Sequence, residues 1–468
     1  AALAFGGFVV HHLLPMRYRM PFFTMLSIAS IVLVFGVQNS AWLVGFGALL
    51  IAVCHLPVRF MVRVGLVVAA AAALVLFRIE WFHGPWSPAI WPILGSMFMF
   101  RIVLYLYDLR YEKAEVSVWR SFSYFFMLPN VCFPLFPVVD YKTFRRNYFD
   151  QESYRIYQVG VEWIARGVVH LILYRVVYYY LTMSPSEIAG PADLTRFIVA
   201  NFLLYLRVSG QFHIIVGMLH LFGFNLPETH HRYFLASSFT DFWRRINIYW
   251  KDFMMKIFYY PIFFKLRGLG TTTALVIATL LVFVATWFLH AIQWFWLRGT
   301  FLIAETDIAF WSILGAVVVV NSLYEIKFGR KRTLSGSKQA AWRELIKRLG
   351  ATAGTFASIC ILWSLWTSES IEAWLSLWSF VGKSTSSVAL VAFGLAGGLL
   401  FFVFSIYREL VESKSPSGAE FPFFKRATVT GCFLFIIALS GIQAVYLQFG
   451  PQSANLVNSL RSGSLSRA

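Results

Sequence analysis

The sequence predicts an all-α polytopic membrane protein, with about 11–13 transmembrane or re-entrant helices around a central tunnel. Of its 468 residues, 59% are hydrophobic and only 13% are charged. A soluble domain usually has about 25% charged residues. The mean hydropathy is +0.67, and apolar runs of about 20 residues, long enough to cross a bilayer as a helix, recur along the chain. A transmembrane β-barrel would instead show short segments of alternating hydrophobicity.

The order of the apolar segments gives the expected helices. Residues 3–14 form a partial segment. The segment at 119–139 contains three prolines and is expected to be broken or re-entrant, because proline frees backbone groups that the surrounding protein must satisfy. With it, the full segments fall at 22–37, 41–56, 64–79, 89–107, 119–139, 160–182, 197–222, 273–297, 301–323, 351–366, 387–406 and 427–448.

These segments suggest a division of the chain into four parts. We expect N-terminal transmembrane helices at 1–118, a central core at 119–300, C-terminal transmembrane helices at 301–450 and a polar tail at 451–468. The tail is rich in Ser and Asn and is expected to be disordered.

The net charge of +18 is expected to reflect Lys and Arg in cytoplasmic loops, which set the orientation in the membrane. Lys and Arg collect in cytoplasmic loops, so the basic stretch 325–350 should be cytoplasmic. Counting spans from there places 241–270 and 140–155 on the cytoplasmic side, and 184–196 and 298–306 outside. We find no nucleic-acid-binding pattern, and neither the four cysteines nor the paired histidines have the spacing of a metal site. The chain is thus expected to be a multi-pass protein of the inner or plasma membrane.

One stretch, "DFWRRINIYWKDFMMKIFYYP" at 241–261, combines charge with aromatic bulk. Its periodicity predicts a single amphipathic helix over 241–257, capped by Ser237 or Thr240 and ended by Pro261. An amphipathic helix at the membrane surface explains most of these residues. It does not explain Asn247, an amide flanked by two tryptophans. The expected apolar stripe consists of Phe242, Ile246, Tyr249, Phe253 and Ile257.

A second candidate is His290, which lies within the apolar stretch 279–299. It comes eight residues before Arg298, about 12 Å from the predicted external end of the helix. An ionisable group at that depth is costly and tends to face a cavity or a partner. Two interpretations stay open, a functional histidine or a structural one that is hydrogen-bonded between helices.

These segments together resemble the membrane-bound O-acyltransferase (MBOAT) family, and its bacterial members in particular. The resemblance covers about residues 120–300 and rests on three phrases that occur in the order of the family pattern. It departs from the bacterial pattern at 207–210, where "RVSG" replaces D-F-S-G, and at 246–247, where Ile-Asn replaces W-H. The phrases are "FFMLPNVCFPLFPVVDYKTF" (125–144), "YLRVSGQFHIIVGMLHLFGFNLPETHHRYFLASSFTDFWRRIN" (205–247) and "WFLHAIQWFW" (287–296).

The resemblance implies transfer of an acyl group from a thioester donor, acyl-CoA, to a hydroxyl acceptor such as an envelope polysaccharide or glycolipid. It implies His290 as the general base and Asn247 as the residue that orients a substrate or stabilises charge, with no metal or other cofactor. Three cationic residues suit the donor phosphates, although contact with lipid headgroups would explain them as well. They are Arg244, Arg245 and Lys251. Three tryptophans are candidates for a tunnel wall, with core packing as the alternative: Trp243, Trp250 and Trp287.

Other functions stay open at the level of sequence. An acyltransferase for lysophospholipids or sterol-like lipids would take its acceptor laterally from the bilayer. A transporter could line its path with His290 and Arg207, but we see no inverted repeat. A family member without activity could serve as a binding partner. The expected partners are membrane lipids, the acyl donor, and an extracytoplasmic acceptor or a partner acyltransferase protein, with no nucleic acid.

Overall fold

The chain folds as a multi-pass helical membrane protein, as the sequence predicts. Seven helical segments among the described residues are long and apolar enough to cross a membrane. Within that part of the chain no strand forms, and one isolated bridge joins Tyr148 to Phe224. The expected segments 387–406 and 427–448 and the polar tail lie outside the described residues. The computed structural model describes residues 2–96, 100–111, 117–127, 139–301, 303–328 and 338–380.

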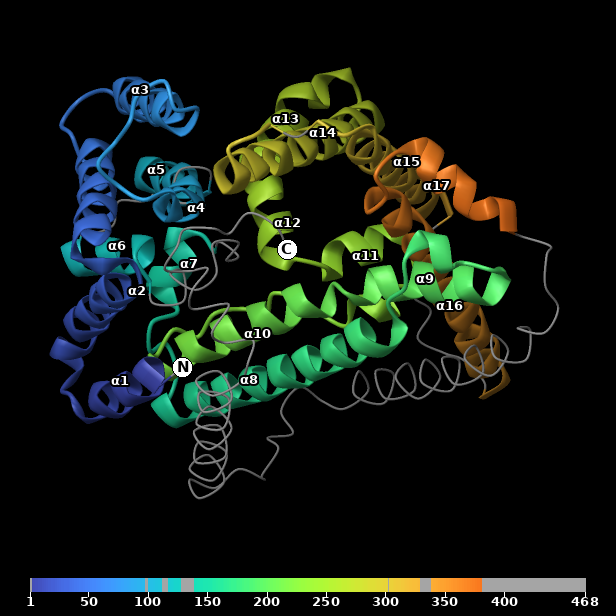
Figure 1. Cartoon of the computed structure of the whole chain (residues 1–468), viewed down its shortest axis with the longest axis horizontal. Helices are drawn as coiled ribbons and strands as arrows, with labels where there is room; N and C mark the ends of the chain where they lie inside the picture. The colour runs from blue at the N-terminus through green and yellow to red at the C-terminus, as the bar shows by residue number, and fades with distance from the viewer. Residues whose placement is uncertain are drawn as a thin grey trace.

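The N-terminal helices form one side of the molecule (Figure 1). The segments expected at 22–37 and 41–56 both lie in α2, which is kinked at Gly36, near the end of the first segment, with a φ of 76°. Only the start of the segment expected at 119–139 is described as a helix, which ends at Phe125. Residues 128–138 lie outside the described ranges. The helices of this side are α1 (Ala2–Leu13), α2 (Met16–Cys54), α3 (Phe60–Arg78), α4 (Trp91–Ser96), α5 (Ile102–Tyr111), α6 (Val118–Phe125) and α7 (Tyr141–Arg146).

Two long antiparallel helices, α8 (Ser153–Val176) and α10 (Leu206–Leu221), cross the molecule side by side (Figure 1). Glycines seven residues apart on each helix let the two backbones meet. A Cβ atom at Gly160 would lie 2.8 Å from the carbonyl oxygen of Gly217, and one at Gly167 would lie 2.6 Å from that of Gly210. Small residues at this spacing allow the close van der Waals contact that holds membrane helices together. Helix α9 (Pro191–Leu203) leads into α10.

The stretch 239–298 forms a broken helix followed by a long one. The prediction of a single helix over 241–257 is wrong, because the helix breaks at Asn247. Its first part is capped by Ser238 and not by Ser237 or Thr240, and Pro261 lies inside α13 instead of ending the helix. The elements are α11 (Phe239–Arg245), α12 (Ile248–Met254), the π-helix η7 (Met255–Tyr259), α13 (Tyr260–Leu266) and α14 (Thr271–Arg298).

The C-terminal described helices are α15 (Glu305–Phe328), α16 (Lys338–Trp366) and α17 (Ile371–Ser376). One hydrophobic core joins the N-terminal helices to α10, α12 and α14, and a second joins α9 and α11 to α15 and α16. The domain boundaries at 118/119 and 300/301 stay predictions, and each core contains residues from both sides of one of them.

We expect Gly217→Ala to destabilise the protein by about 1–3 kcal/mol, because its Cβ atom would overlap the backbone of α8. Thermal unfolding in detergent measures this as a lower Tm. Gly65→Ala is the matched control, since a Cβ atom there has no neighbour within 4 Å. A Tm for Gly217→Ala as high as that of the control would contradict the close approach of α8 and α10.

Candidate active site

The break at Asn247 is a local feature of the backbone. Ile246 is extended, and Asn247 adopts the left-handed conformation with φ 40° and ψ 64°. Among residues with a Cβ atom, Asn and Asp tolerate this conformation best. The side-chain oxygen of Asn247 accepts a hydrogen bond from the backbone N–H of Trp250 at 3.3 Å. Asn247 therefore ends one helix and caps the next.

The loop at 227–231 satisfies the backbone groups that the break exposes. The N–H of Ile248 donates to the carbonyl of Thr229 at 2.7 Å, and the N–H of His231 donates to that of Arg245 at 2.9 Å. The Tyr249 hydroxyl donates to the Pro227 carbonyl at 2.6 Å. Unpaired backbone groups are costly away from water, so these bonds make the break stable within the bundle.

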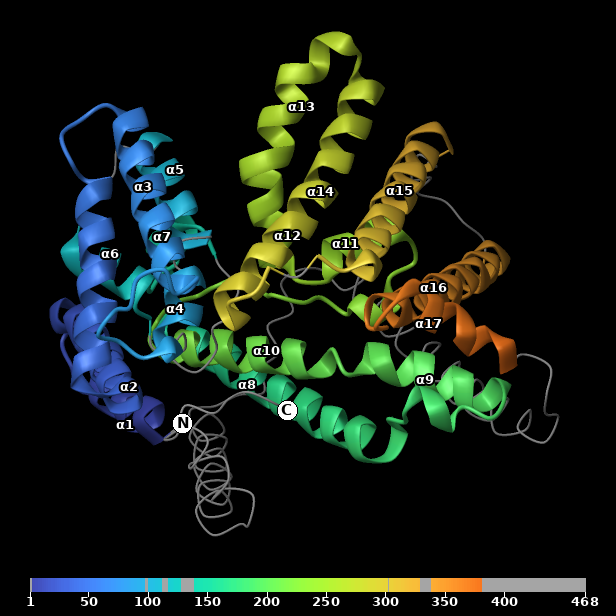
Figure 2. The same ribbon diagram turned by 45° about the horizontal axis from the view of Figure 1, so that its top comes forward.

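Beyond the break, α12, η7 and α13 run antiparallel to α14 (Figure 2). The indole N–H of Trp250 donates to the Thr286 hydroxyl at 3.4 Å, and the Trp250 ring lies 4.9 Å from the ring of His290. Asn247 is thereby brought into the same cavity as His290, which lies in the C-terminal half of α14. The Asn247 side chain is half-buried there.

A cavity of about 330 Å³, here called the chamber, contains both candidate catalytic residues. Asn247 reaches it from the break and His290 from α14. Within the part of the chain that the structure describes, no Asp, Glu, Lys or Arg lines it. Its wall consists of Phe100, Tyr205, Val208, Phe212, Phe242, Trp243, Ile246, Asn247, Tyr249, Trp250, Phe253, His290, Gln293, Trp294, Leu297, Phe310, Trp311, Leu314, Trp363 and Trp366.

Tryptophans hold the imidazole of His290. Its ring lies 4.9 Å from that of Trp250 and stacks on that of Trp311 at 5.0 Å, while Trp366 meets it edge-on at 6.1 Å. The Trp366 indole N–H in turn donates to the carboxylate of Asp307. Stacking uses the ring faces, whereas the imidazole nitrogens bond in the ring plane. Among the described residues no hydrogen bond uses either nitrogen, so both are available to a ligand.

A polar cluster lies behind one wall of the chamber. The Tyr205 hydroxyl is 3.0 Å from Nε2 of His230, and Nδ1 of His230 is 3.1 Å from the Thr229 hydroxyl. Burial lowers the pKa of His230 to about 3, so its imidazole is neutral at pH 7. This cluster links the chamber wall to the loop that supports the break at Asn247.

A second cavity of about 790 Å³, here called the polar cavity, lies toward the other end of α14. Trp243 lines both cavities. The polar cavity meets α14 between Leu275 and Phe283, and the chamber meets it between His290 and Leu297. At 1.5 Å per residue, the stretch from Leu275 to Leu297 is about 33 Å long, close to the thickness of the hydrocarbon core of a bilayer.

The polar cavity contains mixed charge. Lys251 forms an ion pair with the exposed Asp252 at 2.7 Å, and Lys256 lies 2.5 Å from Asp108 and 3.1 Å from Asp140. The exposed Arg244 has no ion pair within the described part of the chain. The cationic side chains that line the cavity are Arg244, Lys251 and Lys256, and the acidic ones are Asp140, Asp252 and Glu325.

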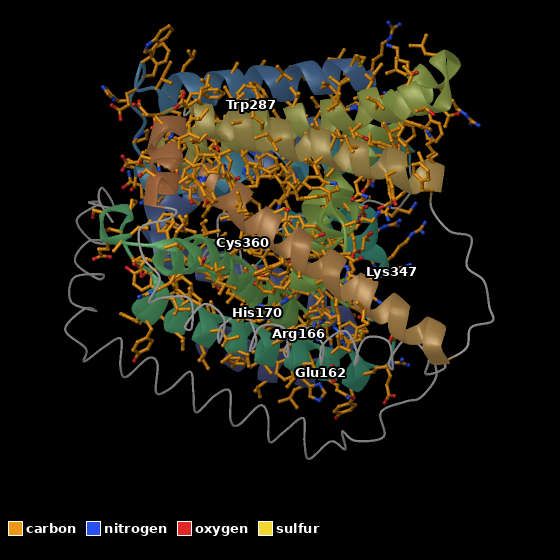
Figure 3. The ribbon with its side chains drawn as sticks, turned by 90° about the vertical axis from the view of Figure 1, so that its right-hand side faces the viewer. Glu162, Arg166, His170, Trp287, Lys347 and Cys360 are labelled. Atoms are coloured by element: carbon orange, nitrogen blue, oxygen red, sulfur yellow. The ribbon has the colours of Figure 1, made fainter. Side chains whose placement is uncertain are left out.

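The other predicted site residues divide between these cavities. Arg244 and Lys251 line the polar cavity, whereas Arg245 does not and pairs with Asp241 at 2.7 Å. Trp243 and Trp250 line the chamber, but Trp287 does not. Trp287 packs against the second hydrophobic core, and Figure 3 shows it on α14, separated in that view from His170 of α8 by Cys360 of α16.

No protein-family model matches the chain, and no curated protein sequence matches it. The resemblance to the MBOAT family therefore rests on the quoted motifs.

Several chamber residues are not predicted by the sequence. Trp311 and Trp366 lie on later helices, and no local pattern connects them to His290. Tyr205 lay within a quoted motif but carried no signal of its own. The position of Gln293 could have been predicted, because a residue three positions after His290 lies on the same side of a helix.

We expect the stability of Asn247 variants to follow their tolerance of the left-handed backbone. Asn247→Gly removes the side chain but permits this conformation, whereas Asn247→Ala adds strain of about 1 kcal/mol. Thermal unfolding in detergent should give a higher Tm for the glycine variant. Equal Tm values for the two variants would show that the break does not constrain this residue.

We expect Lys256→Met to cost about 3 kcal/mol, because it leaves the buried carboxylate of Asp108 without its cation. Lys251→Met is the control, since its partner Asp252 is 60% exposed and such pairs contribute less than about 1 kcal/mol. Urea unfolding of both variants measures the difference. Similar losses would contradict a structural role for the Lys256 ion pairs.

Proposed function

We propose that the chain is an O-acyltransferase of the MBOAT type, which transfers an acyl group from acyl-CoA to a hydroxyl acceptor. The chamber is the observation that carries this proposal. It contains Asn247 and His290, from two different elements, and none of the described residues that line it is charged. Such a site excludes bulk water, which would otherwise hydrolyse the thioester.

The proposed reaction uses both residues. A nitrogen of His290 takes the proton of the acceptor hydroxyl as its oxygen attacks the thioester carbonyl carbon. The amide NH₂ of Asn247 donates to the carbonyl oxygen as negative charge develops there. The C–S bond then breaks, and the CoA thiolate takes the proton from His290. The products are the ester and free CoA.

The cap at Asn247 supports this division of roles. Its side-chain oxygen is occupied by the backbone N–H of Trp250, so its NH₂ group is the part left for a substrate. The tryptophans beside His290 fix the plane of the imidazole without using its nitrogens. Their faces also favour the imidazolium that forms during transfer, through cation–π attraction.

The two cavities along α14 support separate routes for the substrates. The sequence-based orientation assigns the polar cavity to the cytoplasmic side, where acyl-CoA is available. The phosphates of acyl-CoA would bind Arg244, while its acyl group would pass Trp243 into the chamber. The acceptor would come from the end of the chamber at Leu297, nearer the predicted external side. This arrangement favours an envelope polysaccharide or glycolipid as acceptor, and the inner or plasma membrane as location.

We expect His290→Gln to reduce transfer by about 10²–10⁴-fold, the contribution of a general base. Purified protein with radiolabelled acyl-CoA and a hydroxyl acceptor measures the rate of CoA release and ester formation. His170→Gln is the matched control, because His170 is another intramembrane histidine and does not line the chamber; its rate should stay near that of the wild type.

Two outcomes would contradict the proposal. Equal turnover by wild type and His290→Gln would remove His290 from its role. Solute flux through vesicles that contain the wild-type protein, with no thioester turnover for any hydroxyl acceptor, would favour a transporter.

A further inference from the structure

Gln293 is a polar chamber residue that the proposed reaction does not use. It lies three positions after His290 on α14 and lines the same cavity. Residues at this spacing have Cβ atoms about 5–6 Å apart on one side of a helix. Among the described residues, no hydrogen bond uses its amide. Its half-buried amide is therefore free to bond to a ligand in the chamber.

Four other polar groups of the chamber wall are occupied by partners within the protein. The Tyr205 and Tyr249 hydroxyls bond to His230 and to the Pro227 carbonyl. The indole N–H groups of Trp250 and Trp366 bond to Thr286 and Asp307. Among the described residues, the chamber side chains without a hydrogen-bond partner include the NH₂ of Asn247, the imidazole of His290 and the whole amide of Gln293, beside indole N–H groups such as that of Trp311, which can only donate.

The position of Gln293 along α14 indicates which substrate it meets. The polar cavity contacts α14 no further than Phe283, on the N-terminal side of His290. Gln293 lies on the opposite side, between His290 and Leu297. A donor that reaches His290 from the polar cavity leaves the Gln293 side to the acceptor.

We propose that Gln293 binds the acceptor through a hydroxyl next to the one that is acylated. An amide both donates and accepts hydrogen bonds, as a hydroxyl does, so the two are matched. His290 then takes the proton of the reacting hydroxyl while Gln293 holds its neighbour. The acceptor is accordingly a polyhydroxyl group, and a simple alcohol lacks the second contact.

The chamber lining adds a limit on charge. Among the described residues, no cationic or acidic side chain lines it. A phosphate, carboxylate or ammonium beside the reacting hydroxyl would be buried without a counter-ion, at a cost of several kcal/mol. The acceptor is therefore neutral around the hydroxyl that reacts. This inference rests on the proposed function and deepens it.

Gln293→Met tests the inference, because methionine has a similar length and no hydrogen-bonding amide. The probes are octyl glucoside, which has neighbouring hydroxyls, and 1-octanol, which has one hydroxyl and the same alkyl chain. We expect wild type to prefer octyl glucoside. The variant should raise KM for octyl glucoside by about tenfold, a larger change than in KM for acyl-CoA or in the rate with 1-octanol. Thermal unfolding confirms that the variant is folded.

The possible results distinguish a failure of this inference from a failure of the proposed acyltransferase function. If the wild type is active and Gln293→Met has the same KM for octyl glucoside as the wild type, only the role of Gln293 is overturned. Equal use of the two acceptors by wild type would overturn the requirement for a second hydroxyl. No wild-type turnover with any acceptor would overturn both the inference and the proposed function.

Discussion

Two backbone hydrogen bonds, one on each side of Asn247, stabilise the helix break on which the chamber depends. The loop at 227–231 accepts one from Ile248 and donates the other to Arg245. These bonds replace those that a continuous helix would make, so the chain can turn there without leaving buried groups unpaired. The turn sends α12 along α14 and sets Trp250 against Thr286 and His290. The chamber forms at this contact.

The same geometry gives Asn247 two separate physical roles. Its oxygen and its left-handed backbone are structural, whereas its NH₂ group is available to a substrate. A loss of activity in Asn247→Ala would therefore not show catalysis, since strain alone could move the break.

The ion pairs of the polar cavity indicate which basic residue can bind a donor phosphate. Lys251 and Lys256 have acidic partners, which leaves Arg244 as the cation best placed for a phosphate.

The sequence predicts the membrane class, most spans and the two candidate catalytic residues that share the chamber, because hydropathy and local motifs can be read from short stretches of the chain. It does not predict the break at Asn247. The apolar stripe from Phe242 to Ile257 continues through it with helical period, and the bonds that stabilise it come from a loop distant in sequence. Arg245 and Trp287 show the same limit. Their side of the helix depends on where the helix breaks and on which neighbour packs against it.

The central claim is that a thioester reaches His290 from the polar cavity and presents its carbonyl to Asn247. Cryo-electron microscopy of the protein with a non-hydrolysable thioether analogue of acyl-CoA tests it most directly. The account predicts density for the phosphates near Arg244, a chain that passes Trp243, and the carbonyl oxygen within hydrogen-bonding distance of the Asn247 amide. Density that enters the chamber from the Leu297 end, or that leaves the chamber empty, would contradict it.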